Sequence, residues 1–136
     1  MSAGSVLEQY SRRGGPGASD SAAERDPIDD LGCFGWLRGM RERAVMLELR
    51  KKTGNILAVS YGWLERVEFD PSEGIRLYLG GRTIRLAGRN LNAEARPQVR
   101  LFEGIARHRV CWVQEAEHRA GLFGSQQMTV VKQIIW

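Results

Sequence analysis

Hydrophobic and polar residues alternate with a period of two through much of the middle of the chain. Successive side chains of a strand point to opposite faces, so this alternation predicts strands that are buried on one face. Turn sequences rich in glycine, proline, asparagine and aspartate separate the alternating runs and predict hairpins. The predicted strands are 45–50, 56–69 with a bend at Gly62, 75–79 and 82–87, and the predicted turns are 52–55, 70–74 and 80–81.

The turns at 70–74 and 80–81 are short enough to fix the register of the strands around them. The predicted cross-strand pairs are Val67–Leu77, Glu68–Arg76, Phe69–Ile75, Arg76–Arg85, Leu77–Ile84 and Leu79–Arg82. In this register the sheet has one apolar and one polar face, as a half-buried antiparallel sheet requires. The apolar face holds Val67, Phe69, Ile75, Leu77, Ile84 and Leu86, and the polar face holds Arg66, Glu68, Arg76, Tyr78, Thr83 and Arg85.

A helix is predicted over residues 98–108, after these strands. Pro97 suits the start of a helix, because the N–H group that proline lacks has no partner in the first turn. Leu101 and Ile105 lie on one apolar stripe, so we expect the helix to cover the apolar face of the sheet. Gly104 weakens a helix by roughly 1 kcal/mol relative to alanine. A close approach of this helix to the sheet would explain the glycine.

The last third of the chain leaves one alternative open. Residues 110–115 fit either a short strand or a continuation of the helix, whereas residues 128–136 have the β-branched composition of a final strand. The predicted fold is therefore α+β. It is a bent, mostly antiparallel sheet of four to six strands, or a partial barrel, with one helix packed on its apolar face.

The start of the chain has a different composition. It is rich in serine, glycine, alanine and charged residues, and such a segment buries too little surface to offset the entropy of ordering it. We therefore predict a disordered N-terminal tail over residues 1–39 and a single α+β domain over residues 40–136. Within the tail, residues 31–38 form a short apolar island that either docks on the domain or binds a partner. Met40 and Met46 are further candidate starts of translation.

Residues 45–117 contain the strand-turn-strand sequence MLELRKKTGNILAVSYGW and the helix sequence VRLFEGIARHRV. This segment resembles small bacterial proteins with the same order of elements, a resemblance that implies no particular activity. The run of short strands is also similar to an Sm-like barrel, which implies RNA binding. In that family the helix precedes the strands, whereas here it follows them, and the family's RNA-reading loop sequences are absent.

The formal net charge of +4 is unevenly distributed. The first thirty residues hold three basic and six acidic residues, a net charge of −3, so the remainder carries +7. Arg76 and Arg85 are expected to face each other, which is unfavourable unless something neutralises them. A phosphate backbone would do so while Tyr78 stacks on a base, and Arg89, which follows the strand, is expected near them. The alternative is an ordinary charged exterior, with Glu68 beside Arg76.

The four tryptophans are the candidate interface residues. A four-stranded sheet and one helix cannot bury all of them, so either the apolar island and the final strand complete the core or part of this surface contacts a partner. The final strand, as an edge strand, could also pair with another chain. The four residues are Trp36, Trp63, Trp112 and Trp136.

Catalytic and metal-binding motifs are absent from the sequence. His108, Cys111 and His118 lie close together in the chain, but they lack the paired ligand spacing of zinc sites. There is no nucleophile elbow and no phosphate-binding loop, so we expect no enzyme and no cofactor. The two cysteines are expected to be reduced. The chain has no signal peptide and no apolar run of membrane-spanning length, which favours a cytoplasmic protein.

These observations favour a small, non-catalytic, bacterial-type binding or assembly module. Its partner would be another protein or a second copy of the chain, with no membrane and no specific small molecule. The alternative is a basic nucleic-acid-binding domain of the Sm-like or another small-barrel type, which would use Arg76, Tyr78, Arg85 and Arg89.

Overall fold

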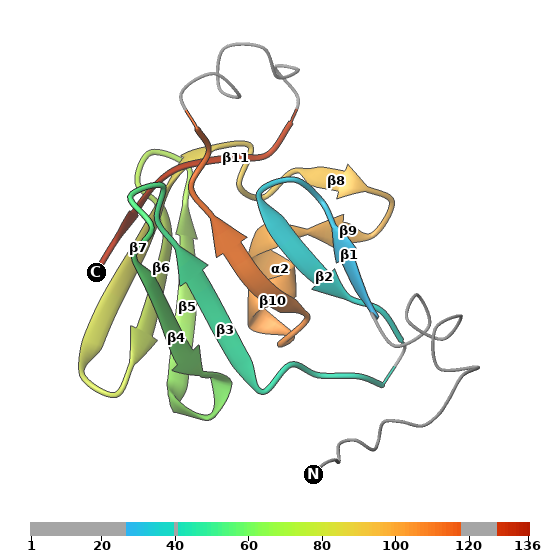
Figure 1. Ribbon diagram of the computed structural model, residues 1–136, viewed down its shortest axis with the longest axis horizontal. Coiled ribbons are helices and arrows are strands. Elements are labelled where there is room, and N and C mark those ends of the chain that lie inside the picture. The colour runs from blue at the N-terminus through green and yellow to red at the C-terminus, as the bar shows by residue number, and fades with distance from the viewer. Residues whose placement is uncertain (1–26, 40, 118–127) are drawn as a thin grey trace, which may run out of the picture.

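The computed structural model describes residues 27–39, 41–117 and 128–136, which form mostly β-strands (Figure 1). The strands make a four-stranded sheet, a five-stranded sheet and a small hairpin. No helix in the described part of the chain has the length and apolar character needed to cross a lipid bilayer.

The four-stranded sheet is antiparallel and contains the predicted meander. Its strands, in spatial order, are β11 (Val130–Ile135), β7 (Arg82–Arg89), β6 (Gly74–Leu79) and β5 (Leu64–Asp70). Every cross-strand pair predicted from the two turns is confirmed, including Arg76 opposite Arg85. Gly80 and Gly81 have φ angles of 51° and 85°, as a two-residue hairpin turn requires.

The five-stranded sheet is mixed. Its strands, in spatial order, are β1 (Ile28–Asp30), β2 (Phe34–Leu37), β10 (Val110–Gln114), β3 (Met46–Arg50) and β4 (Ile56–Ser60). The pairing of β10 with β3 is parallel, and the other pairings are antiparallel. The segment whose conformation the sequence left open is therefore a strand, β10, at the centre of this sheet.

Two segments of the expected N-terminal tail, β1 and β2, are strands of this sheet. Strand β2 pairs with β10, and Phe34 is fully buried in the core. The apolar island at 31–38 is thus folded against the strands. Alternation alone missed it because the run is short and Gly35 interrupts it. The interruption has a steric reason, since a Cβ atom at Gly35 would overlap the indole of Trp112. The predicted disorder of residues 1–26 lies outside the described residues.

The helix is shorter than the sequence predicted. It spans only Leu101–Ala106 (α2) and follows a small hairpin of β8 (Glu94–Arg96) and β9 (Val99–Arg100). The predicted start at residue 98 is wrong, because Pro97 and Gln98 form the turn of this hairpin, with a φ of 66° at Gln98. Gly104 does make a close contact, but with strands outside the predicted sheet, since a Cβ atom there would lie 2.6 Å from Trp36 of β2.

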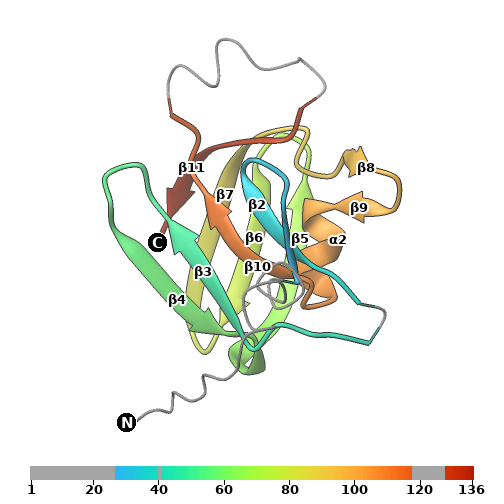
Figure 2. The same ribbon diagram turned by 45° about the vertical axis from the view of Figure 1, so that its right-hand side comes forward.

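The hydrophobic core lies between the two sheets, which face each other in Figure 2 with α2 at one side. Helix α2 contacts β5 of one sheet and β10 of the other. The prediction of a single sheet is therefore wrong. Strands β3 and β4 form a second sheet together with β1, β2 and β10. The described residues form no closed barrel. The largest fully buried side chains are Phe34, Leu47, Leu49, Ile75, Leu77, Ile84, Leu86, Leu101, Ile105, Ile134, Val110 and Val113.

Candidate functional site

The two facing arginines of the predicted polyanion site share an acidic neighbour. Glu73 lies in the turn before β6, and its Oε1 is 3.3 Å from Arg76 Nη2. Arg85 donates from Nε to the main-chain oxygen of Glu73 at 2.8 Å, and the same nitrogen is 3.9 Å from Oε1. A turn carboxylate therefore reduces the repulsion between the two guanidinium groups, a role the sequence pattern had assigned to Glu68 alone.

Glu68 instead interacts with Tyr78 on the neighbouring strand and with Arg66 on its own strand. It accepts a hydrogen bond from Tyr78 Oη at 2.9 Å and forms an ion pair with Arg66 at 3.3 Å. The Arg66 guanidinium also lies 4.2 Å from the centroid of the Tyr78 ring, so one face of this ring is covered. Arg89 is four residues beyond Arg85 on β7, roughly 13 Å away along an extended strand. The structure thus groups Arg76, Arg85 and Tyr78 on one face and leaves Arg89 at a distance.

Three of the four tryptophans are half-buried and have partners within the protein. Arg109 lies 5.5 Å from the centroid of Trp36, Arg50 lies 4.7 Å from that of Trp112, and the Lys51 ammonium lies 4.1 Å from that of Trp136. These cation–π contacts cover aromatic surface that a partner would otherwise use. The fourth tryptophan differs, because 68% of Trp63 is exposed.

Trp63 is held at the corner where the chain passes from β4 to β5. The corner is a 3-10 turn over Tyr61–Trp63, capped by the hydroxyl of Ser60, which accepts from the N–H of Gly62 at 3.1 Å. A groove of about 340 Å³ opens beside it. We call this feature the Trp63 groove, and it is lined by Val59, Ser60, Trp63, Leu79, Gly80 and Arg82.

Strand β4, which leads into this corner, is an edge strand of the five-stranded sheet (Figure 2). The N–H of Tyr61 donates to Val45 O at 3.0 Å, so odd-numbered residues form the hydrogen-bonded pairs of β4 with β3. In an antiparallel ladder the alternate residues point their N–H and C=O groups the other way. The main-chain groups of Ile56, Ala58 and Ser60 therefore line an outer edge that no described strand pairs with.

The other three edges of the two large sheets are protected. Strand β1 has only three residues, two of them aspartates, and β5 carries four charged side chains. Strand β11 contains Lys132 at a bulge, and its edge is covered by hydrogen bonds to Ala116 and Glu115. Short length, charge, bulges and covering groups are the usual protections of edge strands. Strand β4 has five residues and no charged side chain, and Ile56 is 60% exposed.

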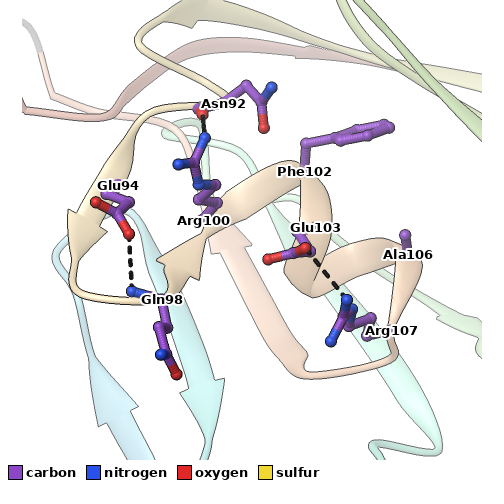
Figure 3. Close-up of a pocket in the computed structure, with 8 residues that line it drawn as sticks. All are labelled: Asn92, Glu94, Gln98, Arg100, Phe102, Glu103, Ala106 and Arg107. Carbon is purple, nitrogen blue, oxygen red and sulfur yellow. Dashed lines mark hydrogen bonds and ion pairs between the residues drawn. The ribbon is translucent and has the colours of Figure 1, made fainter.

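A second surface, which the sequence analysis did not single out, runs along α2. One groove, of about 760 Å³, lies between the β8–β9 hairpin and α2, and Figure 3 shows one ion pair and two hydrogen bonds to main-chain atoms among the residues that line it. Arg107 forms an ion pair with Glu103 at 3.4 Å, and Arg100 donates to Asn92 O at 3.2 Å. This groove shares Gln98, Glu103, Ala106 and Arg107 with an adjoining groove. We call the two together the α2 groove; the second is lined by Trp36, Arg41, Glu42, Arg43, Gln98, Glu103, Ala106, Arg107 and Arg109.

The histidine and cysteine residues have structural contacts. The ring of His108 stacks on Tyr61 at 4.4 Å, and burial, followed by the nearby Arg43 charge, lowers the pKa of His108. Burial raises the pKa of the Cys33 thiol to about 11 and also raises the pKa of Tyr61. His118 lies outside the described residues. Among those described, no three side chains of histidine, cysteine, aspartate or glutamate form a cluster that could hold a metal ion.

Comparison with known proteins gives no relative from which a role could be transferred. No protein-family model matches the chain. No curated protein and no solved structure is detectably similar to it.

Proposed function

We propose that this protein is a non-catalytic binding module that adds an extended segment of a protein partner to the outer edge of β4. The observation that carries the proposal is the combination of an unpaired, uncharged edge strand with three protected edges. An edge strand offers a row of main-chain donors and acceptors, and strand addition is a common mode of peptide recognition.

The surroundings of β4 supply the side-chain contacts that such binding needs. The main-chain groups of Ile56, Ala58 and Ser60 would bind the backbone of the added strand. The Trp63 groove lies at the end of β4 and presents a largely exposed indole, a type of side chain enriched at binding hot spots. Main-chain hydrogen bonds would thus give affinity, and the groove would select a partner with an apolar residue at one position.

Site-specific photo-crosslinking in cells of the source organism tests this proposal. Ala58 is exposed on β4, so a benzophenone amino acid at this position would touch an added strand. The control places the same group at Thr83, which is exposed on the polar face of the other sheet. We expect a discrete crosslinked product from position 58 and none from position 83. The absence of a product at position 58, with the full chain folded and expressed, would overturn the proposal.

Binding of a nucleic acid in the α2 groove is the second candidate function. Arg41 and Arg43 are exposed on this groove and form no ion pair with any described residue. The Nε atom of Arg109 is buried there without a hydrogen-bond acceptor among the described residues. A phosphate group would supply the missing negative charge and acceptor oxygens.

Titration with single-stranded RNA at about 50 mM and about 200 mM salt tests this candidate. Binding to phosphates should weaken steeply as the salt concentration rises. The variant R41Q/R43Q should reduce the affinity for RNA. The variant R76Q/R85Q, which loses the same charge on the polar face of the four-stranded sheet, should leave this affinity unchanged. No binding at the lower salt concentration would eliminate this function.

A further inference from the structure

We infer that the strand added to β4 is β4 of a second copy, in an antiparallel pair whose two-fold axis passes beside Ala58. This inference rests on the proposed function and names its partner. It joins two five-stranded sheets into one continuous sheet of ten strands. Three features of β4 support it: the direction of its main-chain groups, the size of its side chains and its lack of charge.

The main-chain geometry places Ala58 at a position where a two-fold axis can lie. The outward-pointing residues are Ile56, Ala58 and Ser60, and Ala58 is the middle one. In an antiparallel pair centred on Ala58, this residue faces Ala58 of the second copy as a hydrogen-bonded pair, and Ile56 faces Ser60 of the second copy in the same way. Each such pair exchanges two hydrogen bonds, so all outward groups of both strands are satisfied.

The side chains fit the same register. On the exposed face, the large Ile56 lies opposite the small Ser60 of the second copy, and two small alanines meet at the axis. On the other face, Leu57 lies opposite Val59 of the second copy. Both of these side chains are half-buried against the core and have apolar surface left to cover. Val59 also lines the Trp63 groove, so Leu57 of the second copy would approach the exposed indole there.

The distribution of charge favours a second copy over a different partner. Two-fold pairing brings identical segments together, so any charge near the axis would lie close to the same charge of the second copy. Residues 53–64 hold no charged side chain, although charged residues make up 26% of the chain. The segment that would meet itself is therefore free of the repulsion that protects the β1 and β5 edges.

Opposite charges introduced at the axis provide the test. Ala58 is exposed, so A58K and A58E should fold like the natural chain, as judged by circular dichroism. Wild type should be a dimer by light scattering. Each variant alone should be a monomer, because two like charges face each other across the axis, and we expect the dimer dissociation constant to rise at least about 100-fold. An equimolar mixture of A58K and A58E should restore a dimer that contains one chain of each.

The outcomes separate this inference from the proposed function. The control variants T83K and T83E, exposed on the other sheet, should remain dimers. A wild-type monomer at high concentration, or a dimer that A58K and A58E do not affect, would overturn the inference. The proposed function would survive either result if position 58 crosslinks to a different protein. If position 58 forms no crosslink to any protein, both the inference and the proposed function are wrong.

Discussion

Gly74 and Gly81 both have positive φ angles, of 102° and 85°, but their surroundings differ. A Cβ atom at Gly74 would overlap the main-chain oxygen of Leu86 on the neighbouring strand, whereas a Cβ atom at Gly81 would meet nothing within 4 Å. The backbone conformation alone makes both positions unfavourable for other residues. Only Gly74 is also needed for the close contact of two strands.

Alanine substitutions at these two glycines separate conformational strain from steric overlap. We expect G81A to lower the free energy of unfolding by about 1 kcal/mol, the cost of an L-residue in this conformation. G74A should cost at least about 2 kcal/mol more, because β6 or β7 must also move. Urea denaturation of the two variants measures both values. Equal losses of unfolding free energy would show that the close contact with Leu86 does not affect stability.

Cys33 gives the stability of the protein a defined dependence on pH. Its Sγ donates to Thr129 O at 3.2 Å, and burial raises the pKa of the thiol from 9.0 to about 11. Above pH 9 the thiol of the unfolded chain loses its proton while that of the folded chain keeps it, so stability falls as the pH rises. The contribution is fully present below pH 9 and is lost by about pH 11.

The expected loss attributable to Cys33 between pH 8 and pH 10 is about 1 kcal/mol. Urea denaturation at a series of pH values measures it, with C33A as the comparison. The variant should be less stable at neutral pH, since it loses a buried side chain, but its stability should fall less over this range. Tyr61, whose pKa is also raised by burial, adds the same slope above pH 10 to both proteins. Parallel curves for the two proteins would contradict the assignment.

At the scale of the elements, strand pairings could be predicted from the sequence only where the paired strands are close together in the chain. The β5–β6–β7 meander was predicted to the residue, because turns of two to five residues determine its register. The pairing of β2 with β10 joins segments more than seventy residues apart, and the parallel β10–β3 pair joins segments more than sixty residues apart. No local pattern reports such pairings, so the second sheet was missed.

The candidate site was harder to predict for a related reason. The strand 56–60 was recognised, but whether a strand is an edge depends on every other strand of its sheet. Arg76 and Arg85 were correctly placed opposite each other, yet the carboxylate between them comes from the turn residue Glu73. Of the four tryptophans, alternation could not tell which one the fold leaves exposed, because Trp36 and Trp112 lie in β2 and β10, strands of the sheet that was not predicted.

Strands β1 and β2 should be essential for folding. A chain that begins at Met40 lacks both, and it loses Phe34, a fully buried side chain whose removal alone costs about 3 to 5 kcal/mol. Such a chain also leaves β10 without its antiparallel neighbour. We expect it to be unfolded or aggregated by circular dichroism and thermal melting. A chain lacking only residues 1–26 keeps every described strand and should melt cooperatively. A folded chain beginning at Met40 would contradict the role given to β2.

At the scale of the whole molecule, one buried carboxylate links the two sheets through hydrogen bonds. Glu115 is only 5% exposed and accepts the N–H of Lys52, after β3, at 2.9 Å and the N–H of Ile134, in β11, at 2.6 Å. Lys52 follows a strand of the five-stranded sheet and Ile134 belongs to the four-stranded sheet. Hydrogen bonds to a charged acceptor in a buried position are among the stronger ones in proteins.

Removal of this carboxylate should weaken the whole fold. We expect E115A to lower the free energy of unfolding by about 3 kcal/mol, because two main-chain N–H groups lose their acceptor. E115Q keeps one acceptor oxygen and should lose roughly half as much. The neighbouring exposed Glu117 provides the control, since E117A should change stability by less than about 0.5 kcal/mol. Denaturant unfolding of the three variants measures these values. Equal losses of unfolding free energy in E115A and E117A would show that the hydrogen bonds of Glu115 do not stabilise the fold.

The unequal protection of the sheet edges also determines how large an assembly can grow. Two-fold pairing through β4 uses the one unprotected edge of the two large sheets, and it leaves the short acidic β1, the charged β5 and the covered β11 at the outside. A closed, symmetric contact of this kind cannot repeat, whereas a head-to-tail contact extends into fibres. Assembly would therefore stop at two chains, and raising the concentration would populate the dimer without starting a filament.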